Sequence, residues 1–400
     1  MACALGFREL ASLNPFIRDL DEQGYQLDFI NGHFVIYGLP YLDQAGSLRY
    51  GDWISPVDLA EGGAIDPPSN HQAWFRGDKP HGHGGRELSI AVRNNRLQVT
   101  PDLIADLSFS TKLLENGQMR AYRSFEEKVQ TYLHAITAPA MAAYPDATPL
   151  KGIGVKAAAQ NSPLRFPDTS SANYNLADIS SLLRGKKVAI VGLGGTGSYI
   201  LDFLARTHLE RIALFDDDKV HVHTIFRTPG FIHQAIGKKK VEALYQQYGN
   251  WHAGIDPIDE RVTELNIERL LEFDFVFVSV DDGPARRLIV DWLSSKSVPF
   301  VDCGMGLNRS VVGLNGIVRI TGIDRSAFDR TINTAYLPTE NTKEDEYRRQ
   351  AQIAELNALN AALAVIRFKQ YFKMYDRLDE AVWYVFETAS LELDADGRTK

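Results

Sequence analysis

From Lys187 onward, short apolar runs alternate with segments of helical periodicity. Several of these runs are apolar throughout, which is typical of strands buried on both faces of a parallel sheet. The expected strands are 188–191, 211–215, 275–280 and 299–302. The expected helices lie at about 198–207 and 286–295. Alternating strands and helices predict an α/β fold with a Rossmann-like, doubly wound, mostly parallel sheet.

The pattern changes after residue 310. Residues 311–320 predict an antiparallel strand, residues 346–371 a long amphipathic helix, and residues 381–386 a late strand. The helix is expected to bury one apolar stripe. Its members are Ile353, Leu356, Leu359, Leu363 and Ile366.

The first 150 residues predict a smaller α+β domain. A strand is expected at 34–37, a hairpin at 87–99 with Asn94-Asn95 at its turn, and a helix at 125–141. Residues 143–171 hold four prolines and little periodicity, as in a linker. The expected organisation is an N-terminal domain, a linker with an entry segment, and the α/β domain. Their respective ranges are 1–150, 151–182 and 183–400.

Composition narrows the functional classes. A length of 400 residues favours two domains. The net charge of -8 argues against a nucleic-acid partner, and no apolar run approaches the roughly 20 residues that span a membrane. Two cysteines, Cys3 and Cys303, exclude a disulfide scaffold and a four-cysteine zinc site. The expected location is therefore the cytoplasm.

A glycine-rich turn directly follows the strand at 188–191 and opens a helix, which is the context of a nucleotide-binding loop. Its glycines allow backbone to approach a phosphate, and the helix N-terminus offers free N–H donors. The glycines are Gly192, Gly194, Gly195 and Gly197. About 20 residues later Asp216 ends a strand, where it can accept from a ribose hydroxyl. Taken alone, this pattern also fits an NAD(P)-dependent oxidoreductase.

Four further motifs follow in order. They are Asp216-Asp217-Asp218, Thr224-Ile225-Phe226-Arg227, Gly237-Lys238-Lys239-Lys240 and Asp281-Asp282-Gly283-Pro284-Ala285-Arg286. With the glycine turn, they resemble the ThiF/MoeB/HesA family, the adenylating domains related to ubiquitin-activating enzymes. The resemblance covers about residues 183–323, with a looser match in the helix expected at 346–371. It implies an enzyme that adenylates the C-terminal carboxylate of a ubiquitin-like or sulfur-carrier protein.

The resemblance also implies roles for individual residues. Asp216 would hold the ribose of ATP, Arg227 and Lys240 would contact its phosphates, and Asp281 would bind Mg²⁺ with help from Asp218. Cations and a metal suit this chemistry, because carboxylate attack on the α-phosphate brings two anions together. The family's Asn and Gln around the arginine are replaced here by Thr224 and Thr228. A noncatalytic nucleotide-binding scaffold is therefore a second hypothesis.

Transfer of the product to a cysteine is not expected. Activating enzymes that carry a thioester place a cysteine in the loop that corresponds to 324–345, and none occurs there. Cys303 is expected to be a small residue at a buried strand end. Three outcomes stay open for the adenylate: direct transfer to a separate partner protein, release or modification of the product, or an oxyester on a loop hydroxyl. The loop hydroxyls are those of Ser326, Thr331, Thr334, Thr339 and Thr342.

Partner binding is the hypothesis for residues 1–150. By family analogy we expect a homodimer and a conjugating-enzyme-like protein as a further partner. Two histidine pairs, His81 with His83 and His221 with His223, lack an evident third ligand, so we interpret them as hydrogen-bonding loop residues.

Overall fold

The structure, a computed structural model, describes nine stretches of the chain. These are residues 6–88, 90–152, 161–168, 171, 176–230, 233–323, 337, 352–378 and 380–396. The chain divides into two compact units, 1–159 and 160–400. In the described ranges, no helix combines the length and the apolar character that a membrane span requires.

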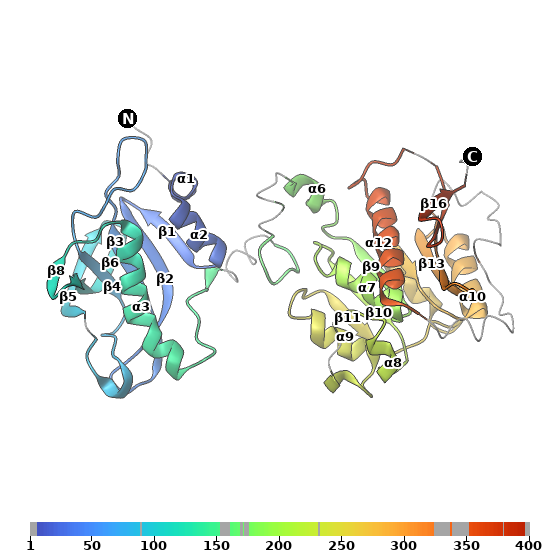
Figure 1. Cartoon of the computed structure of the whole chain (residues 1–400), viewed down its shortest axis with the longest axis horizontal. Helices are drawn as coiled ribbons and strands as arrows, with labels where there is room; N and C mark the ends of the chain where they lie inside the picture. The colour runs from blue at the N-terminus through green and yellow to red at the C-terminus, as the bar shows by residue number, and fades with distance from the viewer. Residues whose placement is uncertain are drawn as a thin grey trace. The chain divides into compact units, whose positions relative to one another are not determined.

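Unit 1 is built on a six-stranded antiparallel sheet in the order β1-β2-β3-β4-β6-β5 (Figure 1). The strands are β1 (Gln26–Ile30), β2 (His33–Leu42), β3 (Leu48–Pro56), β4 (Gln72–Arg76), β5 (Ala91–Thr100) and β6 (Leu103–Ser110). A small separate hairpin joins β7 (Leu113–Glu115) to β8 (Gln118–Arg120), and η1 is a short 3-10 turn (His83–Gly85). The helices are α1 (Phe7–Leu13), α2 (Pro15–Gln23) and α3 (Phe125–Ala143).

Helix α3 begins as its sequence predicts, because the Ser124 hydroxyl accepts a hydrogen bond from the Glu127 N–H at 3.1 Å. It packs against an aromatic core that includes Trp53, Phe75 and Phe109. The hairpin prediction was wrong in position. Residues 94–95 lie inside β5, and the two-residue turn is Pro101-Asp102, where proline cannot donate to the strand ladder.

Unit 2 holds an eight-stranded sheet in the order β11-β10-β9-β12-β13-β14-β15-β16. The first five strands in that order are parallel, and β14, β15 and β16 join antiparallel. The strands are β9 (Lys187–Val191), β10 (Arg211–Phe215), β11 (Ile255–Ile258), β12 (Phe275–Val278), β13 (Phe300–Arg309), β14 (Leu314–Ile323), β15 (Trp383–Glu387) and β16 (Glu392–Ala395). The predicted doubly wound, mostly parallel sheet after a smaller α+β domain is confirmed.

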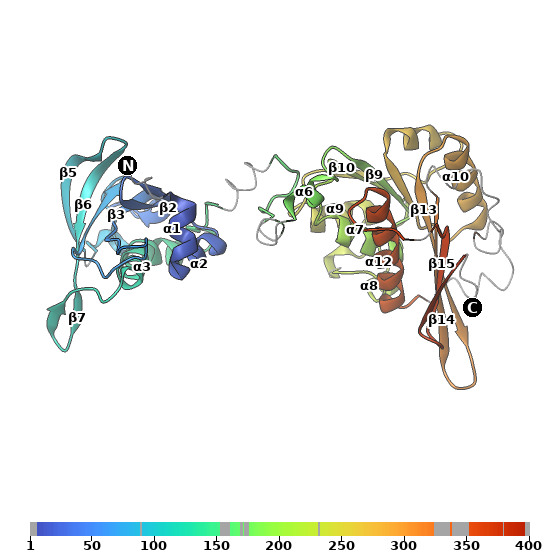
Figure 2. The ribbon, with the colours of Figure 1, turned by 90° about the horizontal axis from the view of Figure 1, so that it is seen from above.

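Helices cover both faces of this sheet (Figure 2). Helices α7 (Gly195–Leu204), α9 (Lys240–Tyr248) and α12 (Ala354–Tyr371) pack on one face, and η3 (Ile267–Glu272) and α10 (Gly283–Ser295) pack on the other. The remaining short elements are α6 (Ala177–Ser181), α8 (Val222–Ile225) and η2 (His233–Ala235). Strands sandwiched in this way have no solvent face, which explains their uninterrupted apolar runs.

The predicted stripe of α12 was wrong at one end. Ile366 is 43% exposed, whereas Asn357, Asn360 and Ala361 are buried. The helix lies close against α7 and β13, so small and amide side chains fill the contact instead of a leucine stripe. The helix begins at Ala354, after Ile353 as its cap; residues 346–351 lie outside the described residues.

Residues 161–168 are fastened to unit 2 by several contacts. Leu164 forms an isolated antiparallel bridge with His252, and the Arg165 N–H donates to the Trp251 carbonyl at 2.8 Å. The ring of His208 hydrogen-bonds Ser162 on one side, at 2.7 Å, and Asp168 on the other, at 3.0 Å. This segment of the expected linker is therefore part of the folded unit.

Candidate functional site

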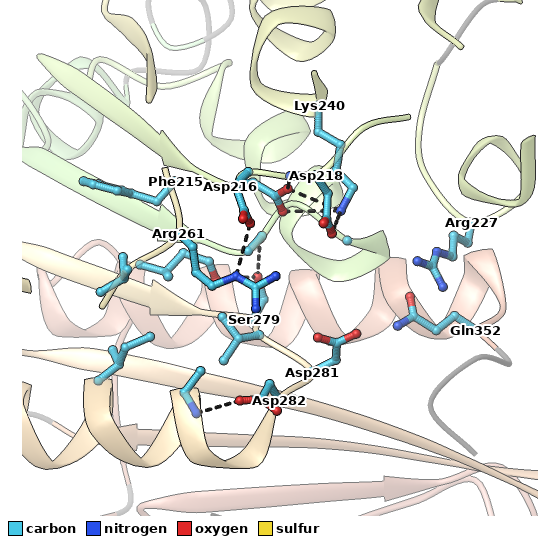
Figure 3. Close-up of a pocket in the computed structure, with 18 residues that line it drawn as sticks. Phe215, Asp216, Asp218, Arg227, Lys240, Arg261, Ser279, Asp281, Asp282 and Gln352 are labelled. Atoms are coloured by element: carbon cyan, nitrogen blue, oxygen red, sulfur yellow. Dashed lines mark hydrogen bonds and ion pairs between the residues drawn. The ribbon is translucent and has the colours of Figure 1, made fainter. Parts of the chain in front are cut away.

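One pocket of unit 2 lies at the carboxyl ends of β9, β10 and β12 (Figure 3). Strand order reverses between β9 and β12, and α/β sheets bind ligands in the crevice at such a point. The empty volume is about 730 Å³, which includes space open to solvent. Its lining residues are Val191, Gly192, Gly194, Phe215, Asp216, Asp217, Asp218, Arg227, Lys240, Arg261, Val262, Ser279, Val280, Asp281, Asp282, Ala285, Ile289 and Gln352.

The glycine turn forms the floor of the pocket. Gly192 has a φ of +90°, and a Cβ there would lie 2.8 Å from the Ser279 carbonyl oxygen. The Ser279 hydroxyl donates to the Gly192 carbonyl at 2.6 Å, which fixes the turn against β12. Gly194 has open space where a Cβ would point, so its side of the backbone is free to receive a ligand.

The other two predicted glycines do not line the pocket. A Cβ on Gly197 would lie 2.0 Å from the Gly192 carbonyl oxygen, so this glycine lets the turn close on itself. A Cβ on Gly195 would lie 2.0 Å from Asn357 Nδ2, so the lack of a side chain at Gly195 leaves room for α12 to pack there. The Asn357 side chain accepts from the Thr196 hydroxyl at 3.0 Å and donates to the Arg227 carbonyl at 3.4 Å. The sequence gives no motif around Asn357, and its role was missed.

Asp216, Asp218 and Lys240 lie together in the pocket, where the lysine is bonded to the carboxylates. The Leu193 and Asp218 N–H groups donate to the two Asp216 carboxylate oxygens at 2.7 and 2.8 Å. Lys240 Nζ donates to Asp218 at 2.8 Å and lies 3.4 Å from Asp216. Burial alone would raise the pKa of Asp218, but the hydrogen bond and charge of Lys240 outweigh burial and lower it. The lysine and Asp216 side chains are both less than a tenth exposed, so this ion pair is fixed.

Arg227 lies at the opposite end of the pocket from Phe215, beside Gln352 and Asp281 (Figure 3). Burial lowers the pKa of its guanidinium, and the carboxylates of Asp281 and Asp218 partly offset the shift. Its Nε is buried without a hydrogen-bond partner in the described part of the chain. A buried donor of this kind costs free energy until an acceptor arrives. The site is therefore prepared for an anionic group.

The carboxylates of the pocket differ in their availability to a cation. Asp216, Asp217 and Asp218 have oxygens within 4.8 Å of one another, but Lys240 occupies two of the three. Asp282 caps α10 by accepting from the Ala285 N–H at 2.9 Å. Asp281 is exposed to the pocket, and an exposed carboxylate is a hard oxygen ligand that fits Mg²⁺.

A buried network of charged side chains, which was not predicted from the sequence, contacts the backbone next to Asp281. Asp302 is fully buried between Arg286 and Arg319, at 2.9 and 2.8 Å. Arg286 also donates to the Val280 carbonyl, directly before Asp281. The network holds the end of β12 in place, so it determines where the Asp281 backbone lies.

The two residues that depart from the family pattern, Thr224 and Thr228, are not among the residues that line the pocket. Thr224 and Thr228 are buried, and the Thr228 hydroxyl donates to the Thr224 carbonyl at 2.7 Å. The Thr224 hydroxyl accepts from the His221 N–H at 3.2 Å. The rings of His221 and His223 stack at a centroid distance of 5.6 Å.

The remaining candidate nucleophiles and ligands are placed as follows. Cys303 lies inside β13, not at its end, and burial strongly raises the pKa of its thiol, so no thiolate is available. His81 is buried and His83 exposed in unit 1. Cys3 and the loop hydroxyls at 326, 331, 334, 339 and 342 lie outside the described residues.

Comparison with known families gives two matches. Residues 172–374, about half of the chain, match the ThiF family. Residues 15–169 match a domain of unknown function, DUF6791. The first match lies within unit 2.

Several curated proteins are similar over part of the chain. Ubiquitin-like modifier-activating enzyme 5 of Drosophila persimilis is 37% identical over 158 residues, which are 35% of this chain and 40% of that protein. The SAMP-activating enzyme E1 of Haloferax volcanii is 26% identical over 122 residues, 30% of this chain and 45% of that protein. A tRNA threonylcarbamoyladenosine dehydratase of Haemophilus influenzae is 24% identical over 131 residues, 32% of this chain and 50% of that protein. The chain thus spans half or less of each relative.

Solved structures resemble the chain more loosely. MccB of E. coli with ATP aligns with a TM-score of 0.45 and 17% identity, over 57% of this chain and 70% of that chain. PaaA aligns with a TM-score of 0.45 and 17% identity, over 58% and 84%. The family match is stronger, because it extends across half of the sequence and contains the pocket. The chain belongs to the ThiF family.

Proposed function

We propose that this protein adenylates the C-terminal carboxylate of a ubiquitin-like or sulfur-carrier protein. A carboxylate oxygen of the substrate attacks the α-phosphorus of ATP. A new P–O bond forms to the substrate, the P–O bond to the β-phosphate breaks, and pyrophosphate leaves. The observation that carries the proposal is the meeting of the glycine turn, Lys240, Arg227 and Asp281 in one pocket of a ThiF-family unit.

Each group has a chemical role in this proposal. The apolar side of the pocket, with Phe215, Val262 and Ile289, receives the adenine, and Asp216 accepts from the ribose. Lys240 has a third ammonium donor left for a phosphate, and the terminal N–H groups of the Arg227 guanidinium donate to another phosphate oxygen. These cations stabilise charge that grows on the phosphates, and no general base is required because the attacking carboxylate is already ionised.

Magnesium fits this arrangement on chemical grounds. The lining has five carboxylates and three cationic side chains, so a nucleotide polyanion needs additional positive charge to enter. Asp281 would hold Mg²⁺ together with phosphate oxygens and water, and the ion would neutralise charge on the leaving pyrophosphate. Asp218 is less suited, because Lys240 already occupies its carboxylate.

Exchange of labelled pyrophosphate into ATP, dependent on a carboxylate-bearing carrier, tests the proposal. Lys240→Gln and Asp281→Asn should each reduce exchange by at least about 100-fold, as expected for lost transition-state stabilisation. Lys238→Gln and Asp291→Asn are matched controls on the surface, and both should retain exchange. Full activity of Asp281→Asn would contradict its assigned role.

Two other functions predict different results. A nucleotide-binding scaffold would bind ATP but support no pyrophosphate exchange in the wild type. An NAD(P)-dependent oxidoreductase would be protected against heat by NAD(P)H and not by ATP. The second alternative leaves Arg227, Lys240 and Asp281 without a role.

We propose that unit 1 binds the carrier or a conjugating-enzyme-like protein. By analogy with the family, we also propose that the chain forms a homodimer through unit 2. Removal of residues 1–150 should preserve ATP binding and abolish capture of the carrier in a pull-down. Unchanged capture would refute the role of unit 1. Light scattering of the purified chain tests the dimer.

A further inference from the structure

Gln352 brings an uncharged amide to a pocket that is otherwise lined by charged, hydroxyl and apolar side chains. It reaches the pocket from the residues just before α12, far along the chain from the glycine turn. Figure 3 shows it next to Arg227 and across from Asp281, at the end away from Phe215. The proposed adenine and ribose contacts lie at the other end, so Gln352 borders the space where the attacking carboxylate must arrive.

The hydrogen-bonding state of Gln352 indicates what it binds. Its Oε1 is buried and has no hydrogen-bond partner in the described ranges. Oε1 is an acceptor, and ionised phosphates offer acceptors only, so ATP phosphates cannot satisfy it. The neighbouring Arg227 has the opposite need, because its Nε is a buried donor with no acceptor among the residues that the structure describes. A ligand that presents both a donor and an anionic acceptor at this end would satisfy the pair.

The end of a peptide chain has this combination. Its last amide N–H is a donor, and its terminal carboxylate is an anionic acceptor a few bonds away. We propose that Gln352 accepts a hydrogen bond from the last peptide N–H of the substrate and so positions its C-terminal carboxylate beside Arg227. This inference rests on the proposed adenylation and narrows it, since small carboxylic acids without an amide N–H would react poorly.

The test compares two substrates in pyrophosphate exchange with the full chain. One is a synthetic peptide acid ending in Gly-Gly, and the other is its depsipeptide, in which an ester oxygen replaces the last N–H. Gln352→Met removes both polar atoms at similar volume. Gln246→Met, on the exposed side of α9, is the matched control.

With the wild type, the ester should lower kcat/KM about tenfold, as expected for one lost buried hydrogen bond. Gln352→Met should lose about tenfold on the peptide and show no further loss on the ester, because the two changes remove the same interaction. Its Kd for MgATP should stay within about twofold of the wild type.

Other results would overturn the inference in distinguishable ways. An equal ester penalty in wild type and Gln352→Met would show that Gln352 does not contact this N–H. A loss of MgATP affinity in Gln352→Met that matches its loss of exchange would assign the amide to the nucleotide. If the wild type exchanges with neither substrate, the adenylation of peptide acids fails, and the inference fails with it.

Discussion

Because Gly195 lies against Asn357, we expect Gly195→Ala to lower the stability of α7, the opposite of its usual effect in a helix. Gly195 is the first residue of α7 and has an ordinary helical φ, so its backbone can accept alanine. In an open helix, alanine in place of glycine gains about 0.5–1 kcal/mol. Here the three atoms nearest to the added Cβ, at 2.0, 2.4 and 2.7 Å, all belong to the Asn357 amide.

Gly195→Ala should therefore destabilise α7 in the wild-type background by about 1–3 kcal/mol, the usual cost of overpacking a filled site. Asn357→Ala removes all three clashing atoms. In that background, Gly195→Ala should be neutral or stabilising by up to about 1 kcal/mol. The two substitutions should thus show a coupling energy of about 2 kcal/mol.

Hydrogen exchange of the α7 amides, followed by mass spectrometry on the full chain, measures the local free energy of opening for the four proteins of this cycle. Gly306→Ala in β13 is a suitable control, because a Cβ at Gly306 meets no atom within 4 Å and the residue lies outside α7. If Gly195→Ala costs the same with and without the Asn357 side chain, the proposed packing of α12 on the glycine turn is refuted.

Three further predictions concern charge and pH. Burial lowers the pKa of His252 from 6.5 to about 4, so between these pH values the unfolded state binds a proton that the folded state does not. The free energy of unfolding should therefore fall by about 3 kcal/mol as the pH is lowered from 6.5 to 4. Urea titrations of His252→Gln should show a smaller fall. Asp302→Asn leaves Arg286 and Arg319 buried without their carboxylate and should destabilise unit 2 by about 3 kcal/mol or more, whereas Asp291→Asn at the surface should change stability by less than about 0.5 kcal/mol in the same titrations. Lys240→Ala removes the lysine from between Asp216 and Asp218, so the pKa of Asp218 should rise. NMR titration of the Asp218 carboxyl carbon measures this shift, and an unchanged pKa would contradict the assigned ion pair.

Most of the fold could be predicted from local sequence patterns. Strands β9, β10 and β12 were predictable because each is buried on both faces, and the glycine turn was predictable because its conformation depends on adjacent residues. The error at Asn94-Asn95 arose because a turn-favouring pair lies at an irregularity of register inside β5, between Asn94 and Leu97. The strand ends instead at Pro101, which lacks an N–H.

The site was predictable only where a motif accompanies the residue. Asp216, Arg227, Lys240 and Asp281 lie in ordered motifs, and the structure brings all four to the pocket. Gln352 and Asn357 come from a separate segment with no motif, and only the packing of α12 reveals them. The roles of Gly195 and Gly197 likewise depend on neighbours distant in sequence or on the closed turn.

The position of α12 has a consequence for how the molecule is made. The hydrogen bond from Thr196 to Asn357 spans 161 residues, so the glycine turn receives its partner only after most of unit 2 has been synthesised. Until then, the apolar side of α7 and the neighbouring strands lack the cover that Ala361, Ala364 and Phe368 provide. Exposed apolar surface of this kind attracts chaperones and favours aggregation in partly made chains. We therefore expect a ribosome-bound chain that ends before residue 371 to be protease-sensitive within α7, and ATP to protect only chains that extend beyond it.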